Sequence, residues 1–327
     1  MKALVTGANG FVGSHLVDAL VARGDDVTCI VRPTSDLTWL DTQSVAIVHG
    51  DVTNADALAA AVAGVDVVFH LAAMLRGRDY AAYYRVNAEG ARNVAQACRR
   101  SADGPPRLVY CSSQAAAGPS VDGRRRTEGD APAPVSDYGR SKLEGERAVA
   151  EVAEGAFPHV ALRPPAVYGP RDTDILIYFR MISRGIAPFV GDGRQAFDLM
   201  YVADLVSAFL MVATNPDAVG SVYYVNDDAE HTWRSMAADI GRVLGRRALP
   251  LPIPLPAIAV VARVAEFAAA ARGVAPVIHR QKVTEFRQAA WQCDSSRIRE
   301  ELGFKSEYDV EHGMRETARW YRDQGWL

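Results

Sequence analysis

The sequence predicts an α/β fold with a doubly wound parallel sheet and a smaller, interleaved carboxyl-terminal substrate-binding domain. Short apolar runs alternate with amphipathic stretches of helical spacing along the amino-terminal half. The expected strands are Lys2–Thr6, Asp26–Val31, Val45–His49, Val65–His70, a run from Leu108 that ends in Ser112 and Ser113, and Val160–Arg163. Such alternation implies parallel strands joined by right-handed crossovers. Ligands of these sheets bind outside the carboxyl ends of the strands.

A glycine-rich turn follows the first strand. It holds Gly7, Gly10, Phe11, Val12 and Gly13, and an amphipathic helix comes directly after it. The glycines permit a tight turn, close approach of the backbone to a pyrophosphate, and close packing of the helix on the strand. The amino terminus of the helix would offer free N–H groups and a positive dipole to the phosphates. The position of the turn, between a strand and a helix, predicts a dinucleotide-binding Rossmann unit.

The end of the second strand bears on which dinucleotide binds. A carboxylate there would accept a hydrogen bond from the ribose 2′-hydroxyl of NAD and would repel the 2′-phosphate of NADP. Val31 and Arg32 occupy this place. We therefore favour NADP(H) over NAD(H), with Arg32 as a cofactor contact. The alternative is that Arg32 only stacks on adenine or is solvated.

Residues after the third and fourth strands complete the expected cofactor site. Asp51, followed by Val52, could accept a hydrogen bond from the adenine amino group, or could cap the following helix, where aspartate is common. Leu71, Ala72 and Ala73 end the fourth strand. Small apolar residues of this kind suit a surface against which a flat cofactor lies.

Two further motifs would meet at the same edge of the sheet. The run from Leu108 ends at Ser113, while Tyr138 and Lys142 stand four residues apart and would share one face of a helix. A tyrosine with the usual pKa of about 10 is a poor acid–base catalyst, and a nearby cation favours its phenolate. Each fragment alone is more often structural. Together with the glycine turn, they predict a site where a serine holds a substrate oxygen and a phenol exchanges its proton during alcohol–carbonyl interconversion.

In this order, the motifs resemble those of an extended short-chain dehydrogenase/reductase. They are Thr-Gly-Ala-Asn-Gly-Phe-Val-Gly, Asp51, His-Leu-Ala-Ala, Ser112-Ser113 and Tyr-Gly-Arg-Ser-Lys. This grouping includes NAD-dependent epimerase/dehydratases and a branch like 3β-hydroxysteroid dehydrogenases and dihydroflavonol reductases. The resemblance implies that Tyr138 is the acid/base, that Lys142 lowers its pKa and holds the nicotinamide ribose, and that Ser113 orients the substrate oxygen. It also implies Asn87 and Pro165 as cofactor contacts, and a homodimer through the helix that carries Tyr138.

Two departures from nucleotide-sugar members bear on the substrate. Arg163-Pro164-Pro165-Ala166 stands where those members show Arg-Tyr-Phe-Asn, and Phe197-Asp198-Leu199 stands where they show Arg-Asp-Tyr/Phe. A diphosphate needs charge-assisted donors worth roughly 1.5–3 kcal/mol each. We therefore expect an oxidoreductase of a bulky, mainly apolar alcohol or ketone, such as a sterol-like, polyketide-like or aromatic molecule. Arg171 and Arg194 could compensate, so a nucleotide-sugar epimerase with bound NAD is the alternative.

The expected division places the Rossmann domain at 1–165, with returns near 197–226, and a substrate-binding cap mainly at 166–327. Within the cap, Ile258 to Ala271 is a strongly apolar helical stretch interrupted by Arg263 and Glu266. We expect a cap helix that lines a hydrophobic pocket or a dimer surface. A peripheral membrane contact through 255–272 and plain core are the alternatives.

Composition excludes several other classes of protein. The chain has 327 residues and a formal net charge of −3, which gives no reason to expect a nucleic-acid partner. The four cysteines lack CxxC spacing, as expected for reduced thiols in a cytoplasmic protein. The seven histidines show no HExxH or other ligand spacing, so we expect no metal. Because Met1 and Lys2 run directly into a strand, we also expect no signal peptide.

Overall fold

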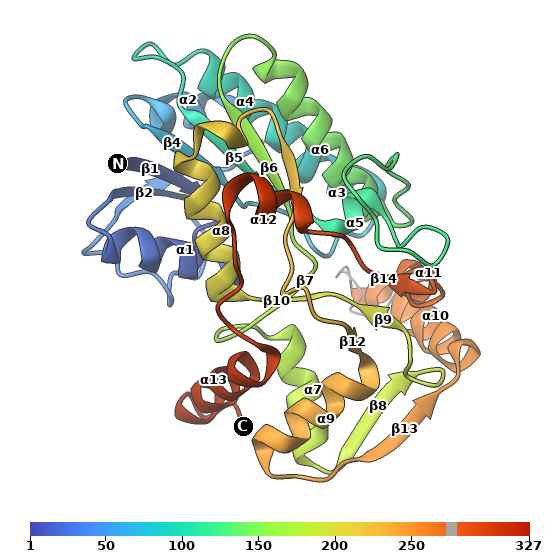
Figure 1. Cartoon of the computed structure of the whole chain (residues 1–327). Coiled ribbons are helices and arrows are strands. Elements are labelled where there is room, and N and C mark those ends of the chain that lie inside the picture. Colours follow the sequence, from blue (N-terminus) through green and yellow to red (C-terminus); the bar gives the residue numbers. More distant parts are fainter. Residues whose placement is uncertain (273–279) are drawn as a thin grey trace.

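A seven-stranded parallel sheet forms the centre of the computed structural model, which describes residues 1–272 and 280–327 (Figure 1). The strand order is β11-β6-β5-β4-β1-β2-β3, and every neighbouring pair is parallel. The strands are β1 (Lys2–Thr6), β2 (Asp26–Val31), β3 (Ala46–His49), β4 (Val67–His70), β5 (Arg107–Cys111), β6 (His159–Arg163) and β11 (Val222–Tyr224). Six of them follow the doubly wound Rossmann order, which confirms the predicted fold class.

Helices cover both faces of this sheet. One face packs against α1 (Phe11–Ala22), α8 (Val202–Thr214) and α12 (Ser296–Leu302), and the other against α2 (Ala55–Val62), α4 (Gly90–Arg99) and α6 (Asp137–Ala153). Successive side chains of β1 point to opposite faces of the sheet, so Leu4 packs in the core on the second face and Val5 in the core on the first. Both faces are therefore buried, which is why the strands read as continuous apolar runs.

The carboxyl-terminal half builds a smaller body below the sheet in Figure 1. Its helices are α7 (Asp174–Ser183), α9 (Trp233–Leu244), α10 (Leu255–Arg272), α11 (Arg280–Phe286) and α13 (Val310–Asp323). Its short strands pair as β10 (Leu199–Tyr201) with β7 (Ala166–Tyr168), as β12 (His231–Thr232), β9 (Ala196–Phe197) and β14 (Ala290–Trp291), and as β13 (Leu249–Ile253) with β8 (Ile186–Val190). Between these elements, α8 and β11 lie in the larger body, so the two halves interleave; a boundary at residue 165 stays a prediction.

A short α-helix and a π-helical turn lead directly into α4. The helix α3 (Tyr80–Tyr84) continues through a π-helical turn, Arg85–Glu89, directly into α4. The remaining short elements are α5 (Gln114–Ala117) and a 3₁₀ turn at Pro216–Ala218. Such π-turns are rare and often occur at functional sites.

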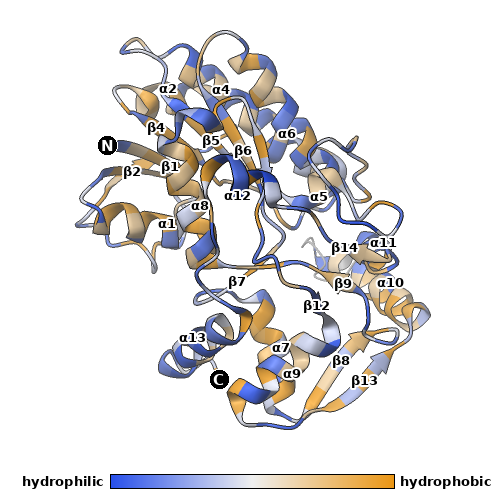
Figure 2. Cartoon of the chain, in the orientation of Figure 1, coloured by the Kyte–Doolittle hydropathy of each residue, from blue (hydrophilic) through white to orange (hydrophobic). Residues whose placement is uncertain are grey.

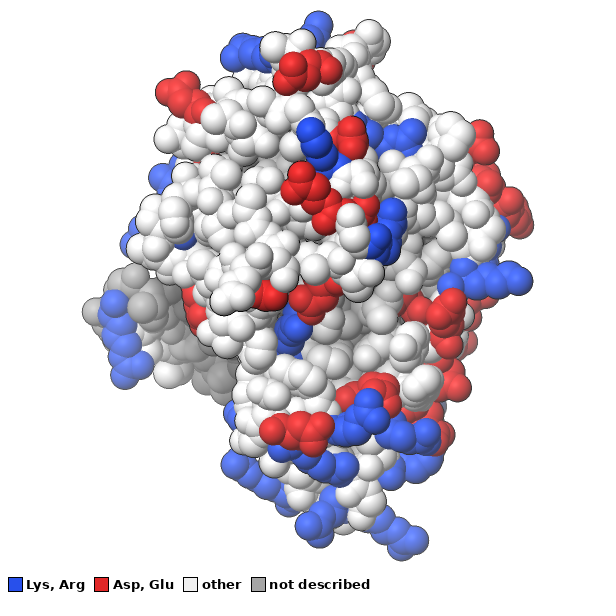
Figure 3. Space-filling model, turned by 90° about the vertical axis from the view of Figure 1, so that its left-hand side faces the viewer, with Lys and Arg blue, Asp and Glu red and all other residues white. Residues whose placement is uncertain are grey.

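The face in Figure 3 carries charges of both signs, and the cysteines form no disulfide. Acidic and basic side chains lie side by side on the face in Figure 3. All four cysteines are free thiols, and three of them, Cys29, Cys98 and Cys293, are buried. Among the described helices, none combines the length and the apolar character that crossing a membrane requires.

Candidate active site

The glycine turn between β1 and α1 has the shape that a dinucleotide requires. Gly7 has φ +71°, and a Cβ there would lie 2.6 Å from the backbone nitrogen of Ala72. A Cβ on Gly13 would lie 2.1 Å from the carbonyl oxygen of Gly7, and Gly10 donates its N–H to that oxygen at 3.0 Å. Side chains at positions 7 and 13 would therefore open the turn. Gly10 is the N-cap residue of α1, and no side chain caps the helix there, so the first N–H groups of the helix are available to phosphate oxygens.

A buried hydrogen bond that the sequence did not reveal holds this turn against β4. The Thr6 Oγ1 lies 2.7 Å from the His70 Nδ1 and accepts the N–H of Ala72 at 3.1 Å. Burial, followed by the nearby charge of Lys142, lowers the pKa of His70 to about 3, so the imidazole is neutral. The bond joins the carboxyl ends of β1 and β4, where the cofactor surface of Leu71 to Ala73 was predicted.

Ser113 and Tyr138 come together where α5 packs on α6. Ser113 caps α5, and its Oγ accepts the N–H of Ala115 at 3.1 Å, which leaves its proton free to donate. A Cβ on Gly139 would lie 2.3 Å from the carbonyl oxygen of Ala115, so the two helices touch through their backbones. The Ser113 hydroxyl is near enough to the Tyr138 phenol to lower its pKa, although burial has the larger and opposite effect.

Lys142 lies one turn further along α6 and is buried, with 1% of its surface exposed. Its Nζ donates to the carbonyl oxygen of Cys111 at 2.6 Å and lies 4.3 Å from the centre of the Tyr110 ring. Burial lowers its pKa to about 8. Burial raises the pKa of the Tyr138 phenol, because it disfavours the phenolate. That Lys142 lowers this pKa stays a prediction.

Asn87 lies in the π-helical turn, and both the oxygen and the nitrogen of its side-chain amide are hydrogen-bonded to other residues of the protein. Its Oδ1 accepts the N–H of Met74 at 2.7 Å, and its Nδ2 donates to the carbonyl of Met74 and to the Ser141 Oγ at 3.1 and 2.9 Å. These bonds connect the segment after Ala73 to α6. Direct contact between Asn87 and a cofactor stays a prediction, and the visible role of the residue is to position its neighbours.

Asp51 follows β3 and closes a turn. Its Oδ1 accepts the N–H and the hydroxyl of Thr53, both at 2.8 Å. Helix α2 is capped by Asn54, whose side chain accepts the N–H of Asp56 at 3.1 Å. The alternative that Asp51 caps this helix is therefore wrong. Val52, the next residue, is buried beside Gly90.

Arg32 is exposed directly after β2, as the sequence implied. A carboxylate that the sequence reasoning did not single out lies four residues later. The side chain of Asp36 accepts the N–H and the hydroxyl of Thr38 at 3.0 and 2.6 Å, and its carbonyl accepts from Asn9 of the glycine turn at 3.2 Å. Both charges thus border the place expected for the adenosine ribose.

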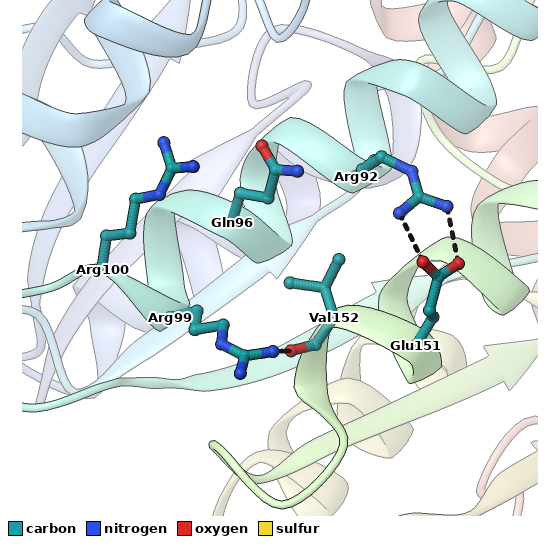
Figure 4. Close-up of a pocket in the computed structure, with 6 residues that line it drawn as sticks. All are labelled: Arg92, Gln96, Arg99, Arg100, Glu151 and Val152. Carbon is teal, nitrogen blue, oxygen red and sulfur yellow. Dashed lines mark hydrogen bonds and ion pairs between the residues drawn. The ribbon is translucent and has the colours of Figure 1, made fainter.

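The predicted residues share one edge of the sheet. The glycine turn, Arg32, Asp51, Leu71–Ala73, Ser113 and Pro165 follow the carboxyl ends of β1 to β6 in turn. A separate hollow of about 440 Å³ lies between α4 and the far end of α6, lined by Arg92, Gln96, Arg99, Arg100, Glu151 and Val152 (Figure 4). Glu151 is about 20 Å along the helix from Tyr138 at 1.5 Å per residue, so this hollow is not part of the site. The described residues contain no group of three or more side chains suited to a metal ion.

Comparisons with known proteins show which proteins this chain is similar to. The chain is 29% identical to a ceramide reductase of Caulobacter vibrioides, over 99% of this chain and 95% of the other. It is 31% identical to a 3 beta-hydroxysteroid dehydrogenase/Delta 5→4-isomerase of Mycobacterium tuberculosis, over 79% and 73% of the two chains. The solved structure of MoeE5 in complex with UDP-glucuronic acid and NAD is 26% identical, with a TM-score of 0.78 and coverage of 99% and 100%.

The family assignment rests on most of the chain. Residues 3–226 match the NAD dependent epimerase/dehydratase family, a span that contains the glycine turn, Ser113, Tyr138 and Lys142. The chain belongs to the NAD dependent epimerase/dehydratase family.

Proposed function

We propose that the protein is an NAD(P)-dependent oxidoreductase that interconverts a secondary alcohol and a ketone on a bulky, mainly apolar substrate. The convergence of Ser113 and Tyr138, with Lys142 one helical turn away, carries the proposal. The three residues lie at the sheet edge that also holds the glycine turn. Backbone atoms would clash with a Cβ at Gly7 or Gly13, so this turn has the bare surface that fits a dinucleotide.

The roles of the three residues follow from their hydrogen-bonding capacity. When bound, the reduced nicotinamide supplies a hydride to the carbonyl carbon. Ser113 donates its free proton to the substrate oxygen and holds it near the phenol. Tyr138 then gives its proton to the oxygen as the alcohol forms. The charge of Lys142 stabilises the phenolate left behind, and placement of the reacting groups contributes effective molarities of about 10⁵ M or more.

An apolar substrate is supported by what the arginines do. Arg163 is bound to the buried Glu146, with nitrogen–oxygen distances of 2.8 and 2.7 Å. Arg171 is bound to Asp18 of α1 at 2.7 Å and stacks over Trp39. Both guanidinium groups are thus engaged within the protein, which weakens the compensation by Arg171 that the sequence allowed. Arg194, the other arginine considered, is 80% exposed beside Asp192, and its compensation stays a prediction. Two relatives are also named for a ceramide and a 3β-hydroxysteroid, both large apolar molecules.

A nucleotide-sugar epimerase is the second candidate. The likeness to MoeE5, solved with UDP-glucuronic acid and NAD, favours it. This function would use the same Ser113 and Tyr138 through a transient 4-keto intermediate. It predicts tightly held NAD and direct binding of nucleotide sugars.

Thermal shift with four ligands separates the two functions. NADPH, NADH, UDP-glucose and UDP-glucuronic acid are added singly to the purified protein, and oxidation of NAD(P)H is then followed with ketosteroids and long-chain ketones. We expect a reduced dinucleotide to raise the melting temperature and to be consumed with an apolar ketone. A rise with a UDP-sugar, with NAD retained through purification, would instead establish the epimerase. A homodimer through α6 and a cytoplasmic location stay predictions.

A further inference from the structure

Helix α10 is apolar on both sides, and only one side is covered. Ile258, Ala262 and Ala269 are buried and pack in a cluster with Val283 of α11. On the opposite side, large apolar side chains are exposed. They are Val260 (61%), Val261 (52%), Val264 (64%) and Phe267 (81%), here called the outer face of α10.

The outer face is a continuous stripe along the helix. Its members recur at spacings of three, four and seven residues, so they lie on one side of the helix. Figure 2 shows α10 as mainly hydrophobic over its length. A helix that is apolar all round is usually buried, whereas a helix at a protein surface usually carries a polar outer side. The outer face is therefore suited to a partner that is itself apolar.

The charges around this face identify the kind of partner. Among the described residues of 255–272 and 280–287, five are basic and two are acidic, a formal charge of +3 in a chain whose net charge is −3. Both acidic residues are already paired, Glu266 with Arg280 at 2.9 Å and Glu285 with Lys282 at 2.8 Å. Arg263 and Arg272 are exposed on α10 itself. A second copy of the chain would bring another positive hairpin against this one, while an anionic lipid surface complements both its charge and its apolar stripe.

We propose that the outer face of α10 docks this protein on a lipid bilayer that carries anionic headgroups. The helix lies along the interface, with Val260, Val264 and Phe267 among the acyl chains and the arginines at the level of the phosphates. Such binding combines burial of apolar area with attraction to anionic lipid.

This surface is connected to the candidate active site through α11. The Gln281 side chain accepts the backbone N–H of Asp137 at 2.6 Å and hydrogen-bonds its carboxylate. Asp137 directly precedes Tyr138, and the charge of Glu285 is close enough to raise the pKa of the Tyr138 phenol. The hydrogen bonds of Gln281 thus link the α10–α11 pair to the start of α6, next to Tyr138.

Vesicle sedimentation tests the docking without substrate or cofactor. The full chain is mixed at low salt with vesicles of pure phosphatidylcholine, and with vesicles of phosphatidylcholine and phosphatidylglycerol. We expect binding to the anionic vesicles and weaker binding to the neutral ones. The double variant Val264→Glu/Phe267→Glu should bind at least about tenfold more weakly, since it places two charges in the apolar interface. Arg263→Gln/Arg272→Gln should lose the preference for anionic lipid.

A matched control and an assay of assembly make the result decisive. Ile177→Glu alters an exposed apolar residue of α7 (46% exposed) and should bind vesicles like the wild type. Circular dichroism verifies that each variant is folded. Failure of the wild type to bind either vesicle, or equal binding by Val264→Glu/Phe267→Glu, overturns the proposal. A dimer that this double variant abolishes, without vesicle binding by the wild type, assigns the face to a second copy instead. A chain that binds vesicles but no NAD(P)H would retain the docking and refute only the proposed function.

Discussion

Arg163 at the end of β6 and Glu146 in the middle of α6 form a buried, bidentate ion pair. The nitrogen–oxygen distances are 2.8 and 2.7 Å, and the exposed fractions of the two side chains are 6% and 8%. The hydroxyl of Ser112 also donates to Glu146. Residues 138, 142 and 146 form one stripe of α6, and each meets one of three consecutive residues. Tyr138 meets Ser113, Lys142 meets the carbonyl of Cys111, and Glu146 meets Ser112.

The ion pair predicts that Glu146→Gln is strongly destabilising. It leaves the Arg163 guanidinium buried without its counter-charge, and breaking a buried pair costs about 3–5 kcal/mol. Glu151→Gln is the matched control, because it makes the same substitution on the same helix in an exposed pair with Arg92. Such pairs contribute less than about 1 kcal/mol. Urea unfolding measures both variants, and equal losses would show that the buried pair has no special role.

Cofactor binding should depend on the charge of Lys142. Burial lowers its pKa from 10.5 to about 8, so the ammonium is charged below pH 7 and loses its proton as the pH rises through 8. We expect NAD(P)H affinity to fall over that range in the wild type, and to be weaker but independent of pH there in Lys142→Met. Fluorescence titration from pH 6.5 to about 9.5 measures this. A fall of equal size in Lys142→Met would assign it to another group.

The lowered pKa of Lys142 should also make the stability of the cofactor-free protein depend on pH. Between pH 8 and 10.5 the unfolded chain keeps the Lys142 proton while the folded chain has lost it, so stability rises with pH over this window. Relative to Lys142→Met, the wild type should gain about 3 kcal/mol from pH 8 to pH 10.5. Urea unfolding at the two ends of the window measures this gain. A constant difference would mean that the buried amine titrates normally.

Substitution of the phenol tests the chemistry most directly. Tyr138→Phe keeps the ring that packs edge-on against Tyr83, at 6.4 Å between ring centres, and removes only the hydroxyl that carries the exchangeable proton. We expect turnover to fall by about 10²–10⁴ with NAD(P)H affinity unchanged. Tyr83→Phe is the control, since it removes the neighbouring hydroxyl and should leave turnover near that of the wild type. Activity retained in Tyr138→Phe would require another acid.

Local patterns explain why so much of the fold was predictable. Parallel strands buried on both faces are apolar over their whole length, and the glycine turn follows from clashes between near neighbours such as Gly7 and Gly13. The predicted start of a strand was wrong where the apolar run begins before the residues that pair with the neighbouring strand. The third and fourth strands begin at Ala46 and Val67, rather than at Val45 and Val65.

Contacts between distant residues were not predictable in this way. Thr6 bonds His70 across 64 positions, and Glu146 pairs with Arg163 across 17. Both pairs depend on which side chains face each other after packing. The exposure of Phe267 belongs to the same class, because an apolar helix has the same sequence pattern whether one side or both sides are covered.

The glycine turn should not tolerate a single methyl group at position 13. In Gly13→Ala the new Cβ would meet the Gly7 carbonyl oxygen at 2.1 Å, so the backbone must move at the place where phosphates are expected. We expect a loss of about 1–3 kcal/mol in stability and no rise in melting temperature on adding NAD(P)H. Gly129→Ala is the control, since the nearest atom to its Cβ would be 3.8 Å away. A normal thermal shift in Gly13→Ala would place the dinucleotide elsewhere.

Arg32 would favour NADPH and Asp36 would favour NADH, and substitution of each residue decides which nucleotide the protein prefers. If Arg32 pairs with a 2′-phosphate, Arg32→Ala should weaken NADPH about tenfold or more, the value of one charge-assisted contact, with NADH unchanged. If Asp36 instead accepts from a ribose 2′-hydroxyl, Asp36→Asn should weaken NADH more than NADPH. Dissociation constants for both nucleotides, measured by fluorescence on the wild type and each variant, give each comparison its internal control. Because Arg32 is exposed at the end of β2 while the Asp36 carboxylate is held by Thr38, we expect the first result.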